Sequence, residues 1–191
     1  MSRIAMHSQA GSADHSGELV SIFPTEIGWM AIVGQIRPAR STKVVQTILI
    51  GHPSAAAARK AAKASTASNS ISEQDWHQKL RQSLEGYSKG QRVDFGEFDL
   101  NLPERTPFRD QVLAATRRLQ YGETTTYGEL ARRVGHPGAA RAVGTVMSTN
   151  RFPILIPCHR VLAAGGKLGG YTSPAGTDLK QRLLEMEQAF A

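Results

Sequence analysis

The single cysteine of the chain lies in the segment Pro157-Cys158-His159-Arg160, directly after the apolar run Ile154-Leu155-Ile156. A thiol reacts as the thiolate, and a neighbouring imidazole and guanidinium both favour that negative form. One cysteine cannot form an internal disulfide, so a functional Cys158 would act as a nucleophile or as a ligand. Free cysteines also serve as small, inert core residues, and the local sequence leaves both interpretations open. The proline after the apolar run predicts a thiol at a strand-to-turn junction.

Two short helices are expected before this cysteine, over residues 126–134 and 139–148. The tight connection Gly135-His136-Pro137-Gly138 joins them, which is typical of a helix-turn-helix. The second helix carries one long basic side chain, Arg141, among small residues, so it can approach another surface closely. That surface is either a neighbouring helix or the floor of a DNA groove.

Charge and composition favour a polyanionic partner. The chain has 191 residues, a net charge of +7 and a pI of about 9.9. A basic surface favours nucleic acid first and an anionic membrane second, and a basic protein with no such partner is the alternative. No apolar stretch is long enough for a membrane span, and residues 1–17 lack the apolar core of a secretion signal. With a single thiol, these features predict a cytoplasmic protein.

The first half of the chain predicts a scaffold. Residues 1–17 are small and polar and are expected to be disordered. Strands are expected over residues 19–25, 28–33 and 43–50, and their short connections predict an antiparallel sheet. A helix is expected over residues 55–64, a loop over 65–70 and an edge strand within 93–102. Ser72 and Asp75 predict the start of another helix, with a core stripe of Trp76, Leu80 and Leu84 and an end at Gly86.

The second half is expected to be mainly helical. Beyond the two helices above, the periodicity predicts helices over residues 108–119 and 179–190. Pro103 and Pro107 mark the boundary between the halves. The predicted fold class is an α/β N-terminal domain with a small antiparallel sheet, residues 18–103, followed by a mainly helical C-terminal domain containing a helix-turn-helix, residues 104–191.

These residues together resemble a known family, the O6-alkylguanine-DNA alkyltransferases, or methylated-DNA–protein-cysteine methyltransferases. The family's active-site motif is similar to Pro157-Cys158-His159-Arg160-Val161, and its C-terminal domain is similar to residues 108–161, with Asn150, and on through Tyr171 to the stretch 183–187. Phe23-Pro24-Thr25 and Gly28-Trp29-Met30-Ala31 resemble a weaker N-terminal signature. The resemblance covers most of residues 19–187.

The resemblance implies repair of alkylated DNA by direct reversal. Cys158 would accept the alkyl group of O6-alkylguanine, and also of O4-alkylthymine, in one irreversible turnover without a cofactor, because a thioether has no good leaving group. His159 would take the thiol proton through a water molecule, Glu187 would orient the imidazole, and Asn150 would hydrogen-bond near the thiol. From the residues alone, Glu187 is also compatible with a solvated carboxylate at a helix end, and Glu185 competes for its role.

The resemblance also implies a DNA interface. The helix from Ala139 would enter the minor groove while the target base rotates out of the stack. The implied DNA-binding residues are Tyr127, Ala140, Arg141, Ala142, Gly144 and Arg160. The implied base pocket consists of Met147, Pro153, Val161, Tyr171, Thr172 and Ser173. From its spacing, Tyr127 is also compatible with a core position in its helix.

Two departures from the family pattern concern the pocket edge and metal binding. The loop over residues 172–176 is about two residues longer than usual. Some relatives hold zinc through N-terminal cysteines, but here His7, His15, His52 and His77 have no ligand-like pairing, so no metal is predicted.

The expected partner is double-stranded alkylated DNA, with no membrane, bound by a monomer or by a cooperative assembly on DNA. A lesion sensor without chemistry is an alternative that Cys158 opposes. A Cys-His hydrolase unrelated to DNA is another, opposed by the helix-turn-helix and the charge.

Overall fold

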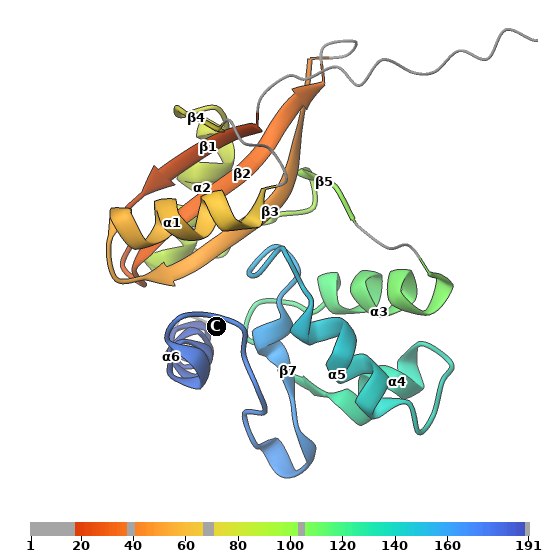
Figure 1. The fold of residues 1–191 in the computed structure, drawn as a ribbon. Coiled ribbons are helices and arrows are strands. Elements are labelled where there is room, and N and C mark those ends of the chain that lie inside the picture. The colour runs from red at the N-terminus through yellow and green to blue at the C-terminus, as the bar shows by residue number, and fades with distance from the viewer. Residues whose placement is uncertain (1–17, 38–40, 67–70, 103–105, 190–191) are drawn as a thin grey trace, which may run out of the picture.

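The computed structural model describes residues 18–37, 41–66, 71–102 and 106–189. A sheet-containing half and a mainly helical half lie next to each other (Figure 1). The predicted disorder of residues 1–17, most of the predicted loop 65–70 and the predicted boundary at Pro103 lie outside the described residues. In the described part of the chain, no helix is both long and apolar enough to cross a membrane.

The sheet has the order β4-β1-β2-β3-β5 and mixed strand directions. Strands β1 (Glu18–Phe23), β2 (Trp29–Arg37) and β3 (Thr42–His52) lie close to the predicted positions and pair antiparallel. Edge strands β4 (Ile71–Glu73) and β5 (Asp99–Leu100) instead pair in parallel with β1 and β3. The prediction of an antiparallel sheet is therefore wrong at both edges, because helical crossovers lead into them.

The two N-terminal helices cover opposite faces of this sheet. Helix α1 (Ala55–Ser65) contributes Ala62 to a cluster with Ala31 and Val33 of β2. Helix α2 (Gln78–Ser88) contributes Leu80 to the larger core, which also contains Ile32. Since successive strand residues point to opposite faces, β2 is buried on both sides.

The predicted start of the second helix at Ser72 is wrong. Ser72 lies in β4, paired with Leu19 of β1, and α2 begins only at Gln78. His77 caps the helix by accepting a hydrogen bond from the Leu80 amide at 3.4 Å. Trp76 therefore lies before the helix, with its indole bonded to the carbonyl of Ile32. The helix also continues past Gly86 to Ser88.

The helical half contains α3 (Pro107–Arg117), α4 (Tyr127–Arg133), α5 (Ala140–Ser148) and α6 (Gly176–Ala189). Helix α3 ends two residues before Leu119, and α6 begins three residues before Leu179. Thr126 and Glu129 form a complete capping box at the start of α4. Between α4 and α5, Gly135 and Gly138 adopt φ values of 80° and 90°, which favour glycine.

A short parallel strand pair joins the α4–α5 unit to the cysteine motif. Strand β6 (Thr125–Thr126) precedes α4, and β7 (Val161–Leu162) directly follows the 3₁₀ turn η2 (Cys158–Arg160). Thr125 pairs with Val161 and Thr126 with Leu162. This pairing fixes the start of α4 relative to Cys158. A further 3₁₀ turn, η3 (Ala164–Gly166), follows β7.

Candidate active site

The segment before Cys158 is a buried turn, so the predicted strand there is wrong. Ile154 adopts a φ of 73°, an unusual backbone conformation for a β-branched residue. The Asn150 side chain holds the turn from both ends: it donates to the Ile156 carbonyl at 2.8 Å and accepts from the Phe152 amide at 3.0 Å. These two hydrogen bonds of Asn150 hold the segment in place of strand pairing, and the chain continues directly into η2.

Cys158 borders an open pocket of about 750 Å³ and is 8% exposed. Tyr127 of α4, Arg141 and Met147 of α5, and Tyr171 lie around the same pocket. The hydroxyl of Tyr171 is buried and has no hydrogen-bond partner among the described residues. A pocket of this size holds a small organic ligand, and an unpaired buried hydroxyl can recognise a polar edge of it.

The burial of Cys158 favours its protonated thiol form. Burial raises its pKa, and a hydrogen bond with Asn150 and the positive charge of Lys180 offset only part of this effect. His159 and Arg160 direct their side chains to Glu187. The expectation that this imidazole and guanidinium favour the thiolate is therefore wrong, because both groups are bonded to Glu187 instead.

His159 and Glu187 form a fully buried pair. The Nε2 atom of His159 lies 2.9 Å from Oε1 of Glu187, and both side chains are 0% exposed. Burial lowers the pKa of His159, and the bond and charge of Glu187 offset this only partly, so the imidazole is neutral near pH 7. Glu185 lies on α6, the same helix as Glu187, but it is exposed and hydrogen-bonded to Gln181. Of the two carboxylates considered from the sequence, Glu187 is the one that contacts His159.

The partners of Glu187 determine which nitrogen of His159 carries the proton. Burial alone would raise the pKa of Glu187, but hydrogen bonds and charges from His159 and Arg160 hold it well below its usual range. An ionised carboxylate only accepts hydrogen bonds, so the Nε2 atom of neutral His159 must be the donor. Its Nδ1 atom then carries the free lone pair. Nδ1 has no hydrogen-bond partner among the described residues.

Arg160 neutralises the same carboxylate. Its Nε atom lies 2.9 Å from Oε2 of Glu187 and its Nη2 atom 2.7 Å from Oε1, while Nη1 donates to the Leu119 carbonyl at 2.6 Å. The residue is only 8% exposed. The prediction that Arg160 contacts DNA is contradicted by this placement, because its guanidinium is used inside the protein.

Lys180 is a residue of the site that the sequence reasoning missed. It is 0% exposed, and its Nζ atom donates to the Val161 carbonyl at 2.7 Å and lies 5.9 Å from the centre of the Tyr127 ring. Burial lowers its pKa to about 8, although the nearby Cys158 opposes this shift. Lysine is seldom buried without a charged partner, so composition gave no reason to place Lys180 inside. The one signal in the sequence was its position three residues before Leu183, on the same face of α6.

The predicted DNA and base-pocket residues fall into three groups. The first lines the pocket beside Cys158 and consists of Tyr127, Ala140, Arg141, Gly144, Met147, Tyr171 and Thr172. The second, Pro153 and Ser173, lines a neighbouring groove formed with residues of β3, which Tyr171 and Thr172 also border. The third does not line the pocket: Ala142 is exposed on α5, and Val161 is 0% exposed.

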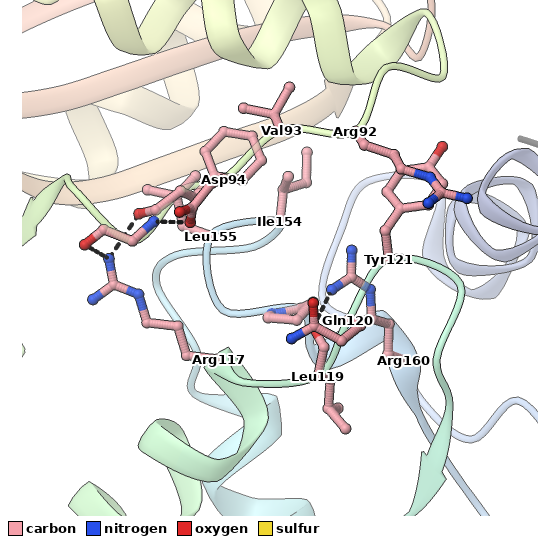
Figure 2. A pocket seen from close by; sticks show the side chains of 13 residues that line it. Arg92, Val93, Asp94, Arg117, Leu119, Gln120, Tyr121, Ile154, Leu155 and Arg160 are labelled. Atoms are coloured by element: carbon pink, nitrogen blue, oxygen red, sulfur yellow. Dashed lines mark hydrogen bonds between the residues drawn. The ribbon is translucent and has the colours of Figure 1, made fainter. Parts of the chain in front are cut away.

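Another cavity, of about 530 Å³, lies between the two halves of the protein. Figure 2 shows Arg92, Val93 and Asp94 facing Leu119 and Gln120 across it. Pro157 and Arg160 line it, but Cys158 does not. This cavity therefore reaches the back of the Glu187 network and not the thiol. In the described ranges, no group of three or more His, Cys, Asp or Glu residues is arranged to hold a metal ion.

Fold and site together describe a protein with one cysteine at a pocket, beside a buried histidine–carboxylate pair. A family model described as "6-O-methylguanine DNA methyltransferase, DNA binding domain" matches residues 107–189. A methylated-DNA–protein-cysteine methyltransferase of Methanosarcina acetivorans is 42% identical over 118 residues, which are 61% of this chain and 72% of that protein. The corresponding protein of Mycobacterium tuberculosis is 48% identical over 96 residues, 50% of this chain and 57% of that protein.

Solved structures agree with these matches. A crystal structure of Mycobacterium tuberculosis OGT in complex with DNA has a TM-score of 0.71 at 29% identity, covering 91% of this chain and 94% of that one. An O6-methylguanine-DNA methyltransferase of the archaeon Pyrococcus kodakaraensis has a TM-score of 0.65 at 26% identity, covering 89% and 98%. The chain belongs to the methylated-DNA–protein-cysteine methyltransferase family.

Proposed function

We propose that this protein repairs alkylated DNA by moving the alkyl group of O6-alkylguanine onto Cys158. The observation that carries the proposal is a single cysteine at an open pocket, next to a neutral histidine whose Nδ1 atom has no hydrogen-bond partner in the described part of the chain. The relatives that match the chain carry the name of this reaction. A carbon bound to oxygen is attacked well by a soft nucleophile, and thiolate is the strongest that a protein offers near neutral pH.

The transfer is balanced without a cofactor. His159 takes the proton of the Cys158 thiol at Nδ1, through a bridging water, and Glu187 stabilises the imidazolium that forms. The sulfur then forms a bond to the alkyl carbon, and the carbon–O6 bond breaks with its electron pair going to the base. The guanine takes up one proton, which balances the proton lost by the thiol. The thioether cannot leave, so each molecule reacts once.

The α4–turn–α5 unit is proposed to act as the helix-turn-helix that binds duplex DNA. Arg141 is exposed on α5 and borders the same pocket as Cys158. It is therefore suited to fill the space left by a base that rotates into the pocket. Met147 and Tyr171 would then contact that base, and Tyr127 would contact the adjacent backbone. The small residues Ala140 and Gly144 allow the close approach that a narrow groove requires.

We also propose different roles for the N-terminal and C-terminal halves of the chain. Residues 104–191 would bind DNA and carry the reacting thiol, and residues 18–103 would support them. The bond from the Ile48 amide to the Arg151 carbonyl, at 2.8 Å, connects β3 to the turn before Cys158 and supports this assignment.

The direct test is incubation with a duplex carrying O6-methylguanine labelled in the methyl group. One label per protein molecule is expected, in the peptide containing Cys158, with unmodified guanine left in the DNA. The Cys158→Ser variant should bind the same duplex without taking up label. Binding by the wild-type protein with no transfer would instead support a lesion sensor, and neither binding nor transfer would support a hydrolase.

A further inference from the structure

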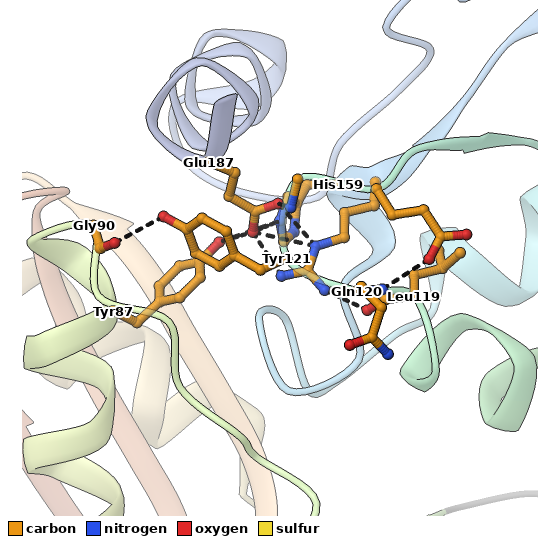
Figure 3. A network of polar contacts seen from close by, with 10 residues as sticks. Tyr87, Gly90, Leu119, Gln120, Tyr121, His159 and Glu187 are labelled. Carbon is orange, nitrogen blue, oxygen red and sulfur yellow. Dashed lines mark hydrogen bonds and ion pairs between the residues drawn. The ribbon is translucent and has the colours of Figure 1, made fainter. Parts of the chain in front are cut away.

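The carboxylate that orients His159 is also held by a tyrosine from the other half of the protein. Tyr87 lies in the last turn of α2, is 1% exposed, and donates its hydroxyl proton to Oε1 of Glu187 at 2.6 Å. The same hydroxyl oxygen lies 3.2 Å from Nε2 of His159. Figure 3 shows Tyr87 reaching from the sheet-containing half to Glu187 and His159.

The direction of these bonds follows from the charges. The ionised carboxylate of Glu187 has no proton to donate, so the hydroxyl of Tyr87 must donate to it. Burial, followed by the charge of Glu187, raises the pKa of Tyr87 well above its ordinary value, so the hydroxyl remains a donor throughout the neutral range. Because this hydroxyl donates to Glu187, the Tyr87 oxygen can interact with His159 only by accepting a hydrogen bond from an N–H group of the ring. Tyr87 and Glu187 therefore both require the proton of neutral His159 to be on Nε2.

The ring of Tyr87 is itself fixed by packing. It makes edge contacts with the rings of Phe95, Tyr121 and His159, at centroid distances of 6.0, 6.1 and 6.5 Å. A hydroxyl on a fixed ring loses little entropy when it forms a hydrogen bond, and it holds its acceptor in one place. The position of Oε1 of Glu187 is thus determined from α2 as well as from α6.

We propose that Tyr87 is a positioning residue for the transfer reaction, which fixes Glu187 and the proton-bearing nitrogen of His159 from the N-terminal half. This inference rests on the proposed function of Cys158 and His159. It gives the N-terminal half a specific part in the chemistry: its α2 helix supplies one of the groups that make the Nδ1 lone pair available to the thiol proton.

Other charged and titratable groups also act on His159. The charges of Glu187, Arg160 and Lys180 act on the ring directly, and Cys158 precedes it in the chain. Tyr171 and Tyr121 lie near enough to sense the charge of Glu187. Removal of the Tyr87 hydroxyl leaves these groups unchanged. Without the 2.6 Å bond from Tyr87, the negative charge of Glu187 interacts more strongly with His159, which raises the pKa of the ring. We expect this effect to exceed the effect of losing the longer 3.2 Å contact between Tyr87 and His159.

Tyr87→Phe tests the proposal, because it keeps the packed ring and removes only the hydroxyl. The matched control is Tyr121→Phe, because the Tyr121 hydroxyl donates to the Gly90 carbonyl at 3.0 Å and not to Glu187. Methyl transfer from duplex O6-methylguanine is measured between about pH 5 and 9, under single-turnover conditions. We expect Tyr87→Phe to slow transfer about tenfold and to move the acid limb of the profile upward by about half a pH unit or more. Tyr121→Phe should leave the position of that limb unchanged.

Nitrogen NMR of the labelled His159 ring, without DNA, provides an independent measurement. The wild-type ring should carry its proton on Nε2 when neutral, and its titration should move upward in Tyr87→Phe. A proton on Nδ1 in the wild type overturns the proposal. So does a slower Tyr87→Phe variant with unmoved ring titration, since that result indicates packing alone. Absence of transfer in the wild type would reject the proposed function, while the ring measurements would still decide the role of Tyr87.

Discussion

Glu187→Gln should destabilise the protein strongly, because this carboxylate accepts hydrogen bonds at both oxygens. Oε1 receives Tyr87, His159 and Arg160, and Oε2 receives Arg160 and the Gly122 amide at 3.1 Å. A glutamine amide has donors on its nitrogen. In either orientation, that nitrogen would therefore face groups that are themselves donors. The substitution removes a charge and creates an unfavourable contact.

The magnitude follows from the burial of the pair. The side chains of Arg160 and Glu187 are 10% and 0% exposed, so solvent screens their interaction little. Removal of one partner of a buried ion pair costs about 3–5 kcal/mol. For a domain of this size, 1 kcal/mol corresponds to about 2–4 °C in Tm, so we expect a decrease of about 6–20 °C. Replacing both partners, as in Arg160→Met with Glu187→Gln, should recover part of this loss because no buried charge is left unpaired.

Thermal and denaturant unfolding of the protein without DNA measure this effect independently of the chemistry. Glu185→Gln is the matched control, since Glu185 is exposed on the same helix, and its stability should stay within about 0.5 kcal/mol of wild type. The folded-state pKa of Glu187 is lowered, so its stabilisation is present above the ordinary carboxyl value near 4.5 and is lost as the pH falls toward the lower folded value. The difference between wild type and Glu187→Gln should therefore shrink below about pH 4. A loss under about 1 kcal/mol near pH 7 would refute the reasoning.

Two further substitutions test the proposed DNA interface and the environment of the thiol. Arg141→Ala should slow repair in duplex DNA at least about tenfold more than reaction with the free base, whereas Arg118→Ala, which also removes one exposed charge, should weaken both little. Equal slowing of both reactions by Arg141→Ala would remove its role in base rotation. Lys180 has a pKa of about 8 and is therefore charged at pH 7, where its charge lowers the pKa of Cys158. Lys180→Met should therefore raise the pKa of Cys158 and slow iodoacetamide labelling of the thiol about tenfold at pH 7, because the thiolate is the reacting form. The control Lys167→Met changes an exposed residue and should label at the wild-type rate, and an unchanged rate in Lys180→Met would show that its charge does not reach the sulfur.

The sequence predicted the elements that depend on local pattern. Strands β1–β3 and helices α1, α4 and α5 lie close to the expected ranges, because alternation, small-residue helix propensity and the Thr126–Glu129 capping box are local signals. The edge pairing and the start of α2 were predicted wrongly. Ser72 carries a typical helix-start signal, but its partner in β1 is Leu19, and no local pattern contains that distant pairing.

The site shows the same division between local and distant information. The motif and the resemblance brought Cys158, His159 and Glu187 to attention, and the latter two are in contact. The influence of the His159 and Arg160 side chains on the thiol was mispredicted, because adjacency in sequence does not determine where side chains point: Arg160 follows His159, yet its guanidinium lies on Glu187, 27 residues away. Tyr87 is 100 residues from the carboxylate that it contacts. Only the tertiary fold brings these groups together.

A protein that is consumed by one reaction, as proposed, benefits from a thiol that is inert before its substrate arrives. A thiolate at an open pocket would react with oxidants and stray electrophiles. Burial raises the pKa of Cys158, and the bond from Asn150 and the charge of Lys180 offset only part of this effect. In the proposed reaction the proton therefore leaves during the transfer itself, and the Nδ1 atom of His159 is the base proposed to take it. Tyr87 of α2 and Glu187 of α6 contact that imidazole, and Arg160 of η2 holds Glu187. If His159 is the base, the reactivity of the cysteine therefore depends on the assembled fold rather than on its own motif.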